Sequence, residues 1–295
     1  MAPASLFTTL APGLFVAIWS TGWIAGKFAS LESDPLTFLA VRFVGAFVVL
    51  VPLCLALRAP WPRAPRAIAH AMVSGILLHA IYLGGVWWAI AHGVPAGLSA
   101  VIAALQPLMT ALLSPLLGHE RIGARRMAGF VVGFLGIVVV VSPKVMGLTG
   151  AALAAAALPL AVNVAAMLAV TLGTFYQKSF VASGHLLTIA TLQYVGAFLA
   201  IVPAVLLLET VRFTPSTTGL LTLAWSVIGL SIGAIGLLLY LIRLGEVSRA
   251  ASLIYLVPPA AVLEAWAFFG ETLSPIQLVG IVVTAVGVAL ANRAK

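Results

Sequence analysis

Residues 98–120 read LSAVIAALQPLMTALLSPLLGHE, an apolar run with a proline, Pro107, near its middle and a glutamate at its end. The same outline returns in residues 249–271, which read RAASLIYLVPPAAVLEAWAFFGE. The proline and the glutamate of the second stretch, Pro258 and Glu271, each lie 151 residues after those of the first. This recurrence indicates that the chain contains two copies of one unit.

The composition identifies the class of protein. Of the 295 residues, 63% are hydrophobic and only 7% are charged, whereas a soluble domain carries about 25% charged residues. The apolar runs have the length of membrane-spanning helices, roughly 20 residues, and lack the strict alternation of barrel strands. We therefore expect an all-α integral membrane protein, and this composition argues strongly against a soluble helical protein.

Ten membrane-spanning helices are expected, joined by connections too short to hold a soluble domain. The first apolar run lacks the basic stretch and the cleavage site of a signal peptide, so we expect it to be a retained helix. The ten spans cover residues 9–29, 36–57, 68–92, 95–117, 124–142, 157–181, 186–208, 218–243, 248–269 and 274–292.

The basic residues predict an orientation. The formal net charge is +8, yet the Lys and Arg residues lie in short loops and are not interleaved with aromatic residues as in a nucleic-acid-binding surface. Eleven of them fall on the side of the two termini, and only Lys27, Lys144 and Arg212 fall on the other side. The positive-inside rule then places both termini in the cytoplasm.

The offset of 151 residues extends through most of each half. Lys27 matches Lys178, and the Val44–Phe47 sequence VGAF returns at Val195–Phe198. Each unit holds five helices, and because five is an odd number the second copy enters the membrane in the opposite direction. Three arginines of an inner loop accordingly correspond to uncharged residues in an outer loop. We expect one membrane domain with a first repeat, 1–145, and an inverted second repeat, 146–295, around a central cavity.

This arrangement resembles the drug/metabolite transporter superfamily, EamA-type branch, whose most specific marks here are Pro107 with Glu120 and Pro258 with Glu271. Within the branch the chain is similar to the bacterial YddG-type amino-acid exporters. The resemblance implies a secondary transporter of the bacterial inner membrane that exports small metabolites by alternating access. It also implies a cavity lined mainly by helices 1, 3, 4, 6, 8 and 9.

Candidate substrate-binding residues are polar or aromatic side chains within the spans. His79 and Tyr82 are three residues apart and share a helix face, although a lone histidine can also be a hydrogen-bonded part of the bundle. Pro107 and Pro258 are expected to kink their helices. Gln106 precedes Pro107, which frees a nearby carbonyl group, so Gln106 is a candidate for binding a substrate amine or carboxylate; the alternative is that the proline only kinks the helix. The remaining aromatic candidates are Trp19 and Trp23, which share a face, together with Tyr240 and Tyr255.

Three charged side chains fall in the outer third of the spans. Lys27, Arg42 and Glu264 suggest a charge pair that shapes an outer gate. The alternatives are that Lys27 extends to the interface, and that Arg42 and Glu264 form a structural pair or a hydrated helix face. Glu120 and Glu271 are interpreted as structural marks of the family, since no base lies close to Glu271 in sequence.

Few other chemistries fit the sequence. One cysteine, Cys54, excludes an internal disulfide, and His119-Glu120 has no second histidine at the spacing of a zinc motif. There is no G-x-x-x-x-G-K-[ST] pattern of an ATP-binding domain. The spans also hold no cluster of nucleophiles, acids or metal ligands at a common depth, so we expect no cofactor, no metal and no enzymatic activity.

An aromatic cavity with few charges favours amino acids, including aromatic ones, as substrates of a monomeric carrier. The alternatives are a multidrug, cation or other metabolite exporter of the same fold, and a channel or a non-transporting scaffold. The sequence leaves open whether transport is coupled to protons or is facilitated.

Overall fold

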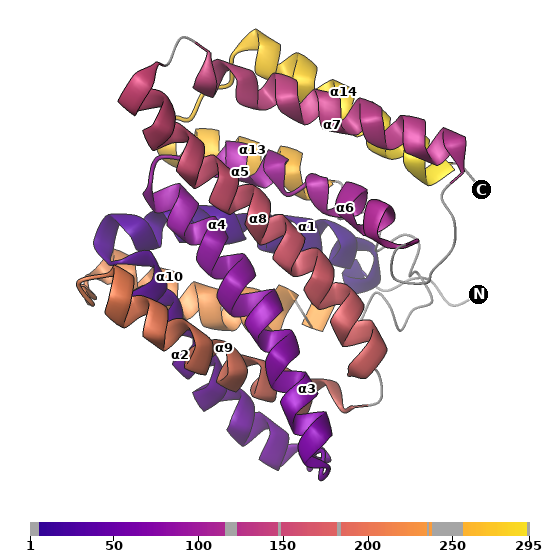
Figure 1. The fold of residues 1–295 in the computed structure, drawn as a ribbon. Coiled ribbons are helices and arrows are strands. Elements are labelled where there is room, and N and C mark those ends of the chain that lie inside the picture. The colour runs from indigo at the N-terminus through magenta and orange to yellow at the C-terminus, as the bar shows by residue number, and fades with distance from the viewer. Residues whose placement is uncertain are drawn as a thin grey trace.

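The structure is a computed structural model that describes residues 6–115, 123–146, 149–181, 184–234, 236–237 and 256–293 (Figure 1). The described residues form helices and connecting segments, and none of them forms a strand. The helices are α1 (Leu6–Glu32), α2 (Pro35–Ala56), α3 (Pro65–Gly75), η1 (Ile76–Ile81), α4 (Tyr82–Ala91), α5 (Ala96–Ile102), α6 (Leu105–Leu113), α7 (Ala124–Val145), α8 (Gly150–Phe180), α9 (Leu186–Leu208), α10 (Thr217–Ala224), η2 (Trp225–Ala234), α13 (Val257–Phe269) and α14 (Pro275–Arg293).

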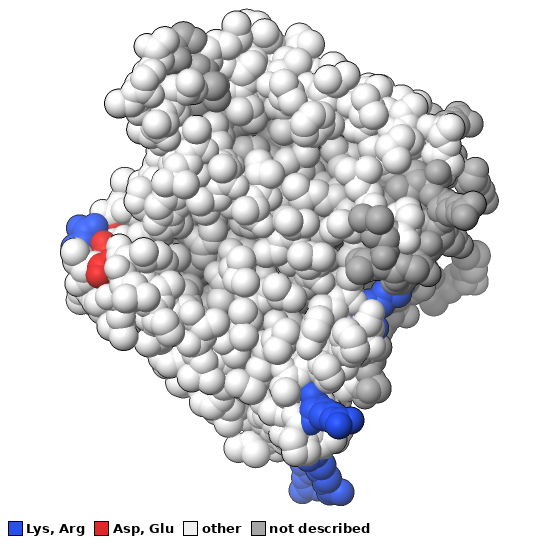
Figure 2. Space-filling model, in the orientation of Figure 1, with Lys and Arg blue, Asp and Glu red and all other residues white. Residues whose placement is uncertain are grey.

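Within the described residues, six helical stretches are long and apolar enough to cross a membrane. The prediction of an all-helical membrane protein is therefore confirmed. On the face seen in Figure 2, the charged side chains gather at opposite ends of the bundle and a broad uncharged surface separates them. The six stretches are Leu10–Glu32, Pro35–Ala56, Pro65–Ala91, Gly150–Phe180, Leu186–Leu208 and Thr217–Ala234.

The expected single helix over residues 95–117 is wrong in one respect, because it is broken into α5 and α6 at Ala103 and Ala104. Pro107 has no N–H with which to bond the carbonyl oxygen of Ala103, four residues earlier. The backbone N–H of Gln106 donates to that oxygen instead, at 3.1 Å, in a tighter turn. The carbonyl that Pro107 was expected to leave free for a ligand is therefore already occupied.

Two π-helical segments interrupt the α-helices, η1 (Ile76–Ile81) and η2 (Trp225–Ala234). An offset of 151 residues carries η1 onto positions inside η2. The same offset joins the first residues of α2 and α9, and those of α7 and α14. Single π-helical turns are rare and often mark functional sites.

Glycines permit the closest helix contacts in the bundle. The helices α7 and α14, at the top of Figure 1, pack against each other through glycines that leave no room for a Cβ atom. A Cβ atom on Gly136 would overlap Thr284, and a Cβ atom on Gly287 would overlap Gly133. A Cβ atom at Gly75 in α3 would similarly meet the backbone of α9. Small residues allow such close backbone approach in lipid, where apolar burial gives little driving force.

Candidate functional site

Arg42 of α2 lies buried within the bundle, with 5% of its surface exposed. It is the eighth residue of α2, so it lies about 10 Å along the helix from its first residue. Its Nη2 atom donates to Ser231 Oγ of η2 at 3.3 Å, and its guanidinium carbon lies 5.5 Å from the centre of the Trp87 ring. Its Nε atom is buried and has no hydrogen-bond partner among the residues that the structure describes. Arg42 is thus a buried cation whose hydrogen-bonding capacity is only partly used.

Aromatic and hydroxyl groups surround this cation. His79 of η1 stacks on Tyr194 of α9, with ring centres 4.7 Å apart and planes inclined by 15°. His79, Tyr82 and Tyr194 all lie close enough to Arg42 to interact with its charge. We call this group the Arg42 cluster; its members are Arg42, His79, Tyr82, Trp87, Tyr194 and Ser231.

A chain of amide and hydroxyl groups extends from the Arg42 cluster. The Gln193 side chain interacts with His79, and its Nε2 atom donates to Ser74 Oγ at 2.9 Å and to Gln177 Oε1 at 3.1 Å. These contacts join α9, which carries Tyr194 of the cluster, to α3 and α8.

Of the other predicted substrate residues, Trp23 is the most deeply placed. It is buried, and its indole N–H has no acceptor in the described part of the chain. Trp19 is partly buried and packs against Phe15, with ring centres 5.3 Å apart. The Gln106 carbonyl oxygen accepts a bond from the Thr110 hydroxyl at 2.8 Å, which stabilises the start of α6. Tyr240 and Tyr255 lie outside the described residues.

The three charged residues expected at a gate do not meet. Lys27 Nζ lies 2.7 Å from Glu271 Oε1, so Lys27 pairs with a glutamate that was expected to lack a nearby base. Glu264 instead accepts a hydrogen bond from Ser20 Oγ at 2.6 Å, and Arg42 lies in the Arg42 cluster. The expected pairing among these three residues is therefore wrong. Lys27 and Glu271 are far apart in sequence, so only the fold shows that they are partners.

Glu271 also binds the first turn of another helix. Its two carboxylate oxygens accept bonds from the backbone N–H groups of Ala96 and Gly97, at 3.2 and 3.1 Å, where α5 begins. Glu209 makes the same kind of contact at the start of α2, with Leu36 N at 2.8 Å and Thr37 N at 2.7 Å. A carboxylate at a helix N-terminus satisfies free N–H groups and complements the helix dipole.

Asp34 ties the α1–α2 connection to the loop after α9. It accepts bonds from the backbone N–H groups of Thr210 and Arg212, at 3.1 and 3.0 Å, and from the Thr210 hydroxyl at 2.8 Å. Burial raises the pKa of Asp34, but these hydrogen bonds and the Arg212 charge outweigh burial and hold the pKa below its ordinary value. We call the end of the bundle that carries Asp34, Glu209 and Glu271 the clasp end.

The comparisons with known proteins identify the family. The sequence model of the EamA-like transporter family matches residues 10–142 and 157–293. The chain belongs to the EamA-like transporter family. It is therefore a membrane transporter of the drug/metabolite superfamily, as the resemblance predicted, and the family name indicates a transporter rather than an enzyme.

Relatives of this EamA family member carry similar descriptions. The chain is 28% identical over 287 residues to "Uncharacterized inner membrane transporter YedA" of Escherichia coli, which covers 94% of this chain and 88% of that protein. It is 24% identical over 283 residues to the "Probable amino-acid metabolite efflux pump" of Salmonella typhimurium, over 93% of this chain and 91% of that protein. A chain in a crystal structure has the same fold, with a TM-score of 0.64 at 21% identity over 96% of this chain and 95% of that chain.

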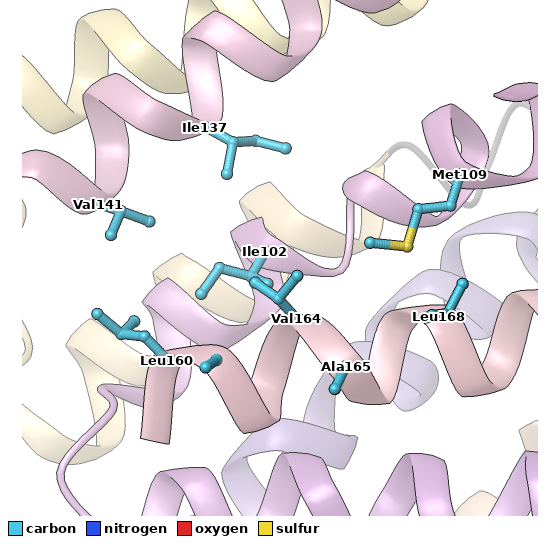
Figure 3. A pocket seen from close by; sticks show the side chains of 9 residues that line it. Ile102, Met109, Ile137, Val141, Leu160, Val164, Ala165 and Leu168 are labelled. Atoms are coloured by element: carbon cyan, nitrogen blue, oxygen red, sulfur yellow. The ribbon is translucent and has the colours of Figure 1, made fainter. Parts of the chain in front are cut away.

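A cavity of about 420 Å³ lies between α5, α6, α7 and α8 of this EamA transporter (Figure 3). Among the described residues, aliphatic side chains and Met109 line it, and none of these lining side chains is charged or forms hydrogen bonds. A metabolite site needs a few polar groups that fix the orientation of the ligand, and this cavity supplies none. We therefore place the candidate site at the Arg42 cluster.

Sequence reasoning found part of this cluster and missed the rest. His79 and Tyr82 were found because polar groups are rare in the spans, and the same signal marks Tyr194 and Gln193 in α9. Ser231 gave no such signal, because a serine can bond the backbone of its own helix. Here Ser231 does so, donating to the Ser226 carbonyl at 3.1 Å, and in addition accepts from Arg42.

Proposed function

We propose that this chain exports small amphipathic metabolites, above all amino acids including aromatic ones, across the bacterial inner membrane. The observation that carries the proposal is the Arg42 cluster, which offers one cation, several hydroxyl groups and aromatic walls within a membrane-spanning bundle. A zwitterion with an apolar side chain suits such a site, because both its charged end and its ring find partners. The name of the Salmonella relative supports the same substrate class.

We infer that transport proceeds by alternating access between two inverted five-helix repeats, residues 1–145 and 146–295. The two separate matches of the family model support a duplication, as do the helices that begin 151 residues apart. Two copies of one fold can exchange conformations, which gives two states open to opposite sides.

In this scheme the clasp end faces outward, both termini lie in the cytoplasm and the monomer is the working unit. The bias of Lys and Arg toward the opposite loops supports this orientation. The contacts of Asp34, Glu209 and Glu271 hold the clasp end together in the structure, which is the arrangement expected of a state closed to the outside.

Counterflow into vesicles tests this function. The full chain is reconstituted, the vesicles are loaded with unlabelled phenylalanine, and uptake of labelled phenylalanine is followed. A carrier gives transient, saturable accumulation that leucine reduces and glucose does not. Ion current without saturation would identify a channel instead, and equal uptake by empty vesicles would show that the chain does not carry amino acids.

A second candidate function is export of organic cations, and one observation favours it. Glu264 lies within α13, and its Oε2 atom is buried without a hydrogen-bond partner among the described residues. A carboxylate within a span marks the path of a substrate or an ion, and a lipophilic cation would supply the opposite charge. If cations are the substrates, Glu264→Gln abolishes their transport; if amino acids are, this variant keeps counterflow of phenylalanine.

A further inference from the structure

Arg42 is a buried cation without a counter-ion among the described residues. The ion pairs described in the structure are Lys27 with Glu271 and Arg212 with Asp34, both at the clasp end. A charged side chain within a membrane span is costly, and such residues mark the path of a ligand or an ion unless they are paired. The charge of Arg42 therefore calls for an anion that the described part of the chain does not supply.

The geometry around the guanidinium group specifies what kind of anion fits. Arginine has five N–H donors in a planar fork, and Ser231 accepts one of them at 3.3 Å, a long contact. The Nε atom, which forms one prong of the fork, is buried and unpartnered. A planar group with two oxygen atoms matches this fork with two parallel hydrogen bonds.

Hydroxyl groups lie near the charge of Arg42. The phenol groups of Tyr82 and Tyr194 both lie within reach of the Arg42 charge, and Tyr194 also interacts with Ser231. Hydroxyl groups can donate to an anion, but they add no positive charge. The described site thus offers a single fixed cation, which suits a singly charged carboxylate better than a doubly charged phosphate ester.

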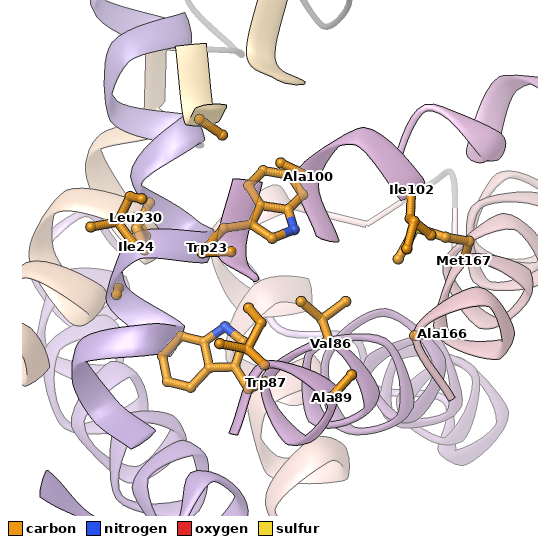
Figure 4. Packing of buried hydrophobic residues seen from close by; sticks show 14 of the residues in the cluster. Trp23, Ile24, Val86, Trp87, Ala89, Ala100, Ile102, Ala166, Met167 and Leu230 are labelled. Atoms are coloured by element: carbon orange, nitrogen blue, oxygen red, sulfur yellow. The ribbon is translucent and has the colours of Figure 1, made fainter. Parts of the chain in front are cut away.

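The walls of the site are aromatic. Trp87 lies under the guanidinium group, and Phe43 packs against His79 and Tyr194, with ring centres 6.3 and 5.8 Å away. Trp23 and Trp87 belong to the same buried cluster between α1 and α4 (Figure 4). The part of a ligand beyond its carboxylate would therefore meet aromatic rings.

We propose that Arg42, assisted by Tyr82, Tyr194 and Ser231, binds the carboxylate group of the transported molecule. The proposal rests on the transport function above and narrows it to small monocarboxylates with an apolar or aromatic remainder. Arg42 is thus a binding residue rather than part of a gate. Its side chain discriminates acids from their amides, esters and decarboxylated amines.

Competition in the counterflow assay tests this discrimination. The competitors are phenylalanine, 3-phenylpropionate, phenylalaninamide, phenylalanine methyl ester, phenethylamine and phenyl phosphate. Phenylalanine and 3-phenylpropionate carry the carboxylate and should compete at least about tenfold better than the other four compounds. A hydrogen bond to a charged group contributes about 1.5–3 kcal/mol, and 1.4 kcal/mol corresponds to a tenfold change in affinity.

Variants of Arg42 test the same contact from the side of the protein. Arg42→Lys keeps the charge without the planar fork and should raise the half-saturating concentration about tenfold. Arg66→Gln, at an exposed arginine, is the matched control and should resemble the wild type.

A binding measurement keeps the inference testable independently of transport. In detergent, 3-phenylpropionate should raise the melting temperature of the wild type and of Arg66→Gln, but not that of Arg42→Gln. Equal competition by acid, amide and ester would overturn the inference and leave amino-acid export standing. If phenylalanine counterflow is absent, the proposed function is wrong, but the role of Arg42 is still decided by the melting experiment. That role is refuted if 3-phenylpropionate stabilises neither the wild type nor Arg42→Gln, or stabilises both equally.

Discussion

Lys27 and Glu271 form an ion pair that links α1 to the segment after α13, with 2.7 Å between Nζ and Oε1. The lysine also lies 5.2 Å from the centre of the Phe269 ring. Ser20 and Glu264 make a contact of the same sequence separation, 244 residues, and lie about two helical turns earlier along the two helices. Two contacts with equal separation show that α1 and α13 run parallel and in register, so this pair secures the clasp end of that interface.

Neutralising Glu271 should loosen the clasp end. Glu271→Gln keeps the shape of the side chain but weakens its bonds to Lys27 and to the first turn of α5. Partly exposed ion pairs contribute about 1 kcal/mol, so we expect the clasp end to open about fivefold more often. The measurement is the rate at which an impermeant maleimide labels Ala100→Cys, a fully buried position in α5, in a chain with Cys54→Ala.

A matched control separates this effect from a general loss of positive charge. Lys178 lies 151 residues after Lys27 and is exposed in the last turn of α8. Lys27→Met should increase labelling as Glu271→Gln does, and Lys178→Met should leave it unchanged. Labelling that stays at the wild-type rate in both clasp-end variants would contradict the role of the pair.

Asp34 should make the stability of the protein depend on pH. Its pKa in the folded protein is lower than in the unfolded chain, because the amide groups of Thr210 and Arg212 bind its charged form. Its stabilising contribution is therefore complete above the unfolded value, about 3.9, and is lost as the pH falls through the folded value. Asp34→Asn should melt at a lower temperature than the wild type at pH 7, and the difference should shrink as the pH is lowered below about 4. A difference that is constant from pH 7 to pH 3 would rule this out.

The aromatic ring of His79 should contribute more to the stability of the fold than the hydrogen bonds of its nitrogen atoms. The ring stacks on Tyr194, and such aromatic pairs contribute about 0.5–1.5 kcal/mol beyond the area they bury. His79→Phe should therefore melt close to the wild-type temperature, and His79→Ala should melt lower. If His79→Phe melts as low as His79→Ala, the contact of His79 with Gln193 rather than the stacking stabilises the fold, and this prediction is wrong.

The helices could be predicted because hydrophobic runs and a 151-residue offset are local or periodic signals. The break at Ala103 was missed, although Pro107 causes it, because the chain satisfies the freed carbonyl by tightening the turn rather than by kinking one long helix. The partners of Lys27 and Arg42 could not be predicted from one sequence, since each lies in the other half of the chain. A charge in a span indicates that a partner or a ligand is needed, but only the packing of α2 against η2 shows that Arg42 reaches Ser231.

Gly136 provides the sharpest test of the packing between α7 and α14. A Cβ atom there would overlap Thr284 and the Gly280 carbonyl oxygen, so Gly136→Ala must push the two helices apart. Overpacking of this kind costs roughly 1–3 kcal/mol, and we expect a clearly lower melting temperature in detergent. Gly22→Ala is the matched control, because a Cβ atom at Gly22 meets nothing within 4 Å and alanine favours the helix. A variant Gly136→Ala as stable as Gly22→Ala would show that α7 and α14 do not depend on this close contact.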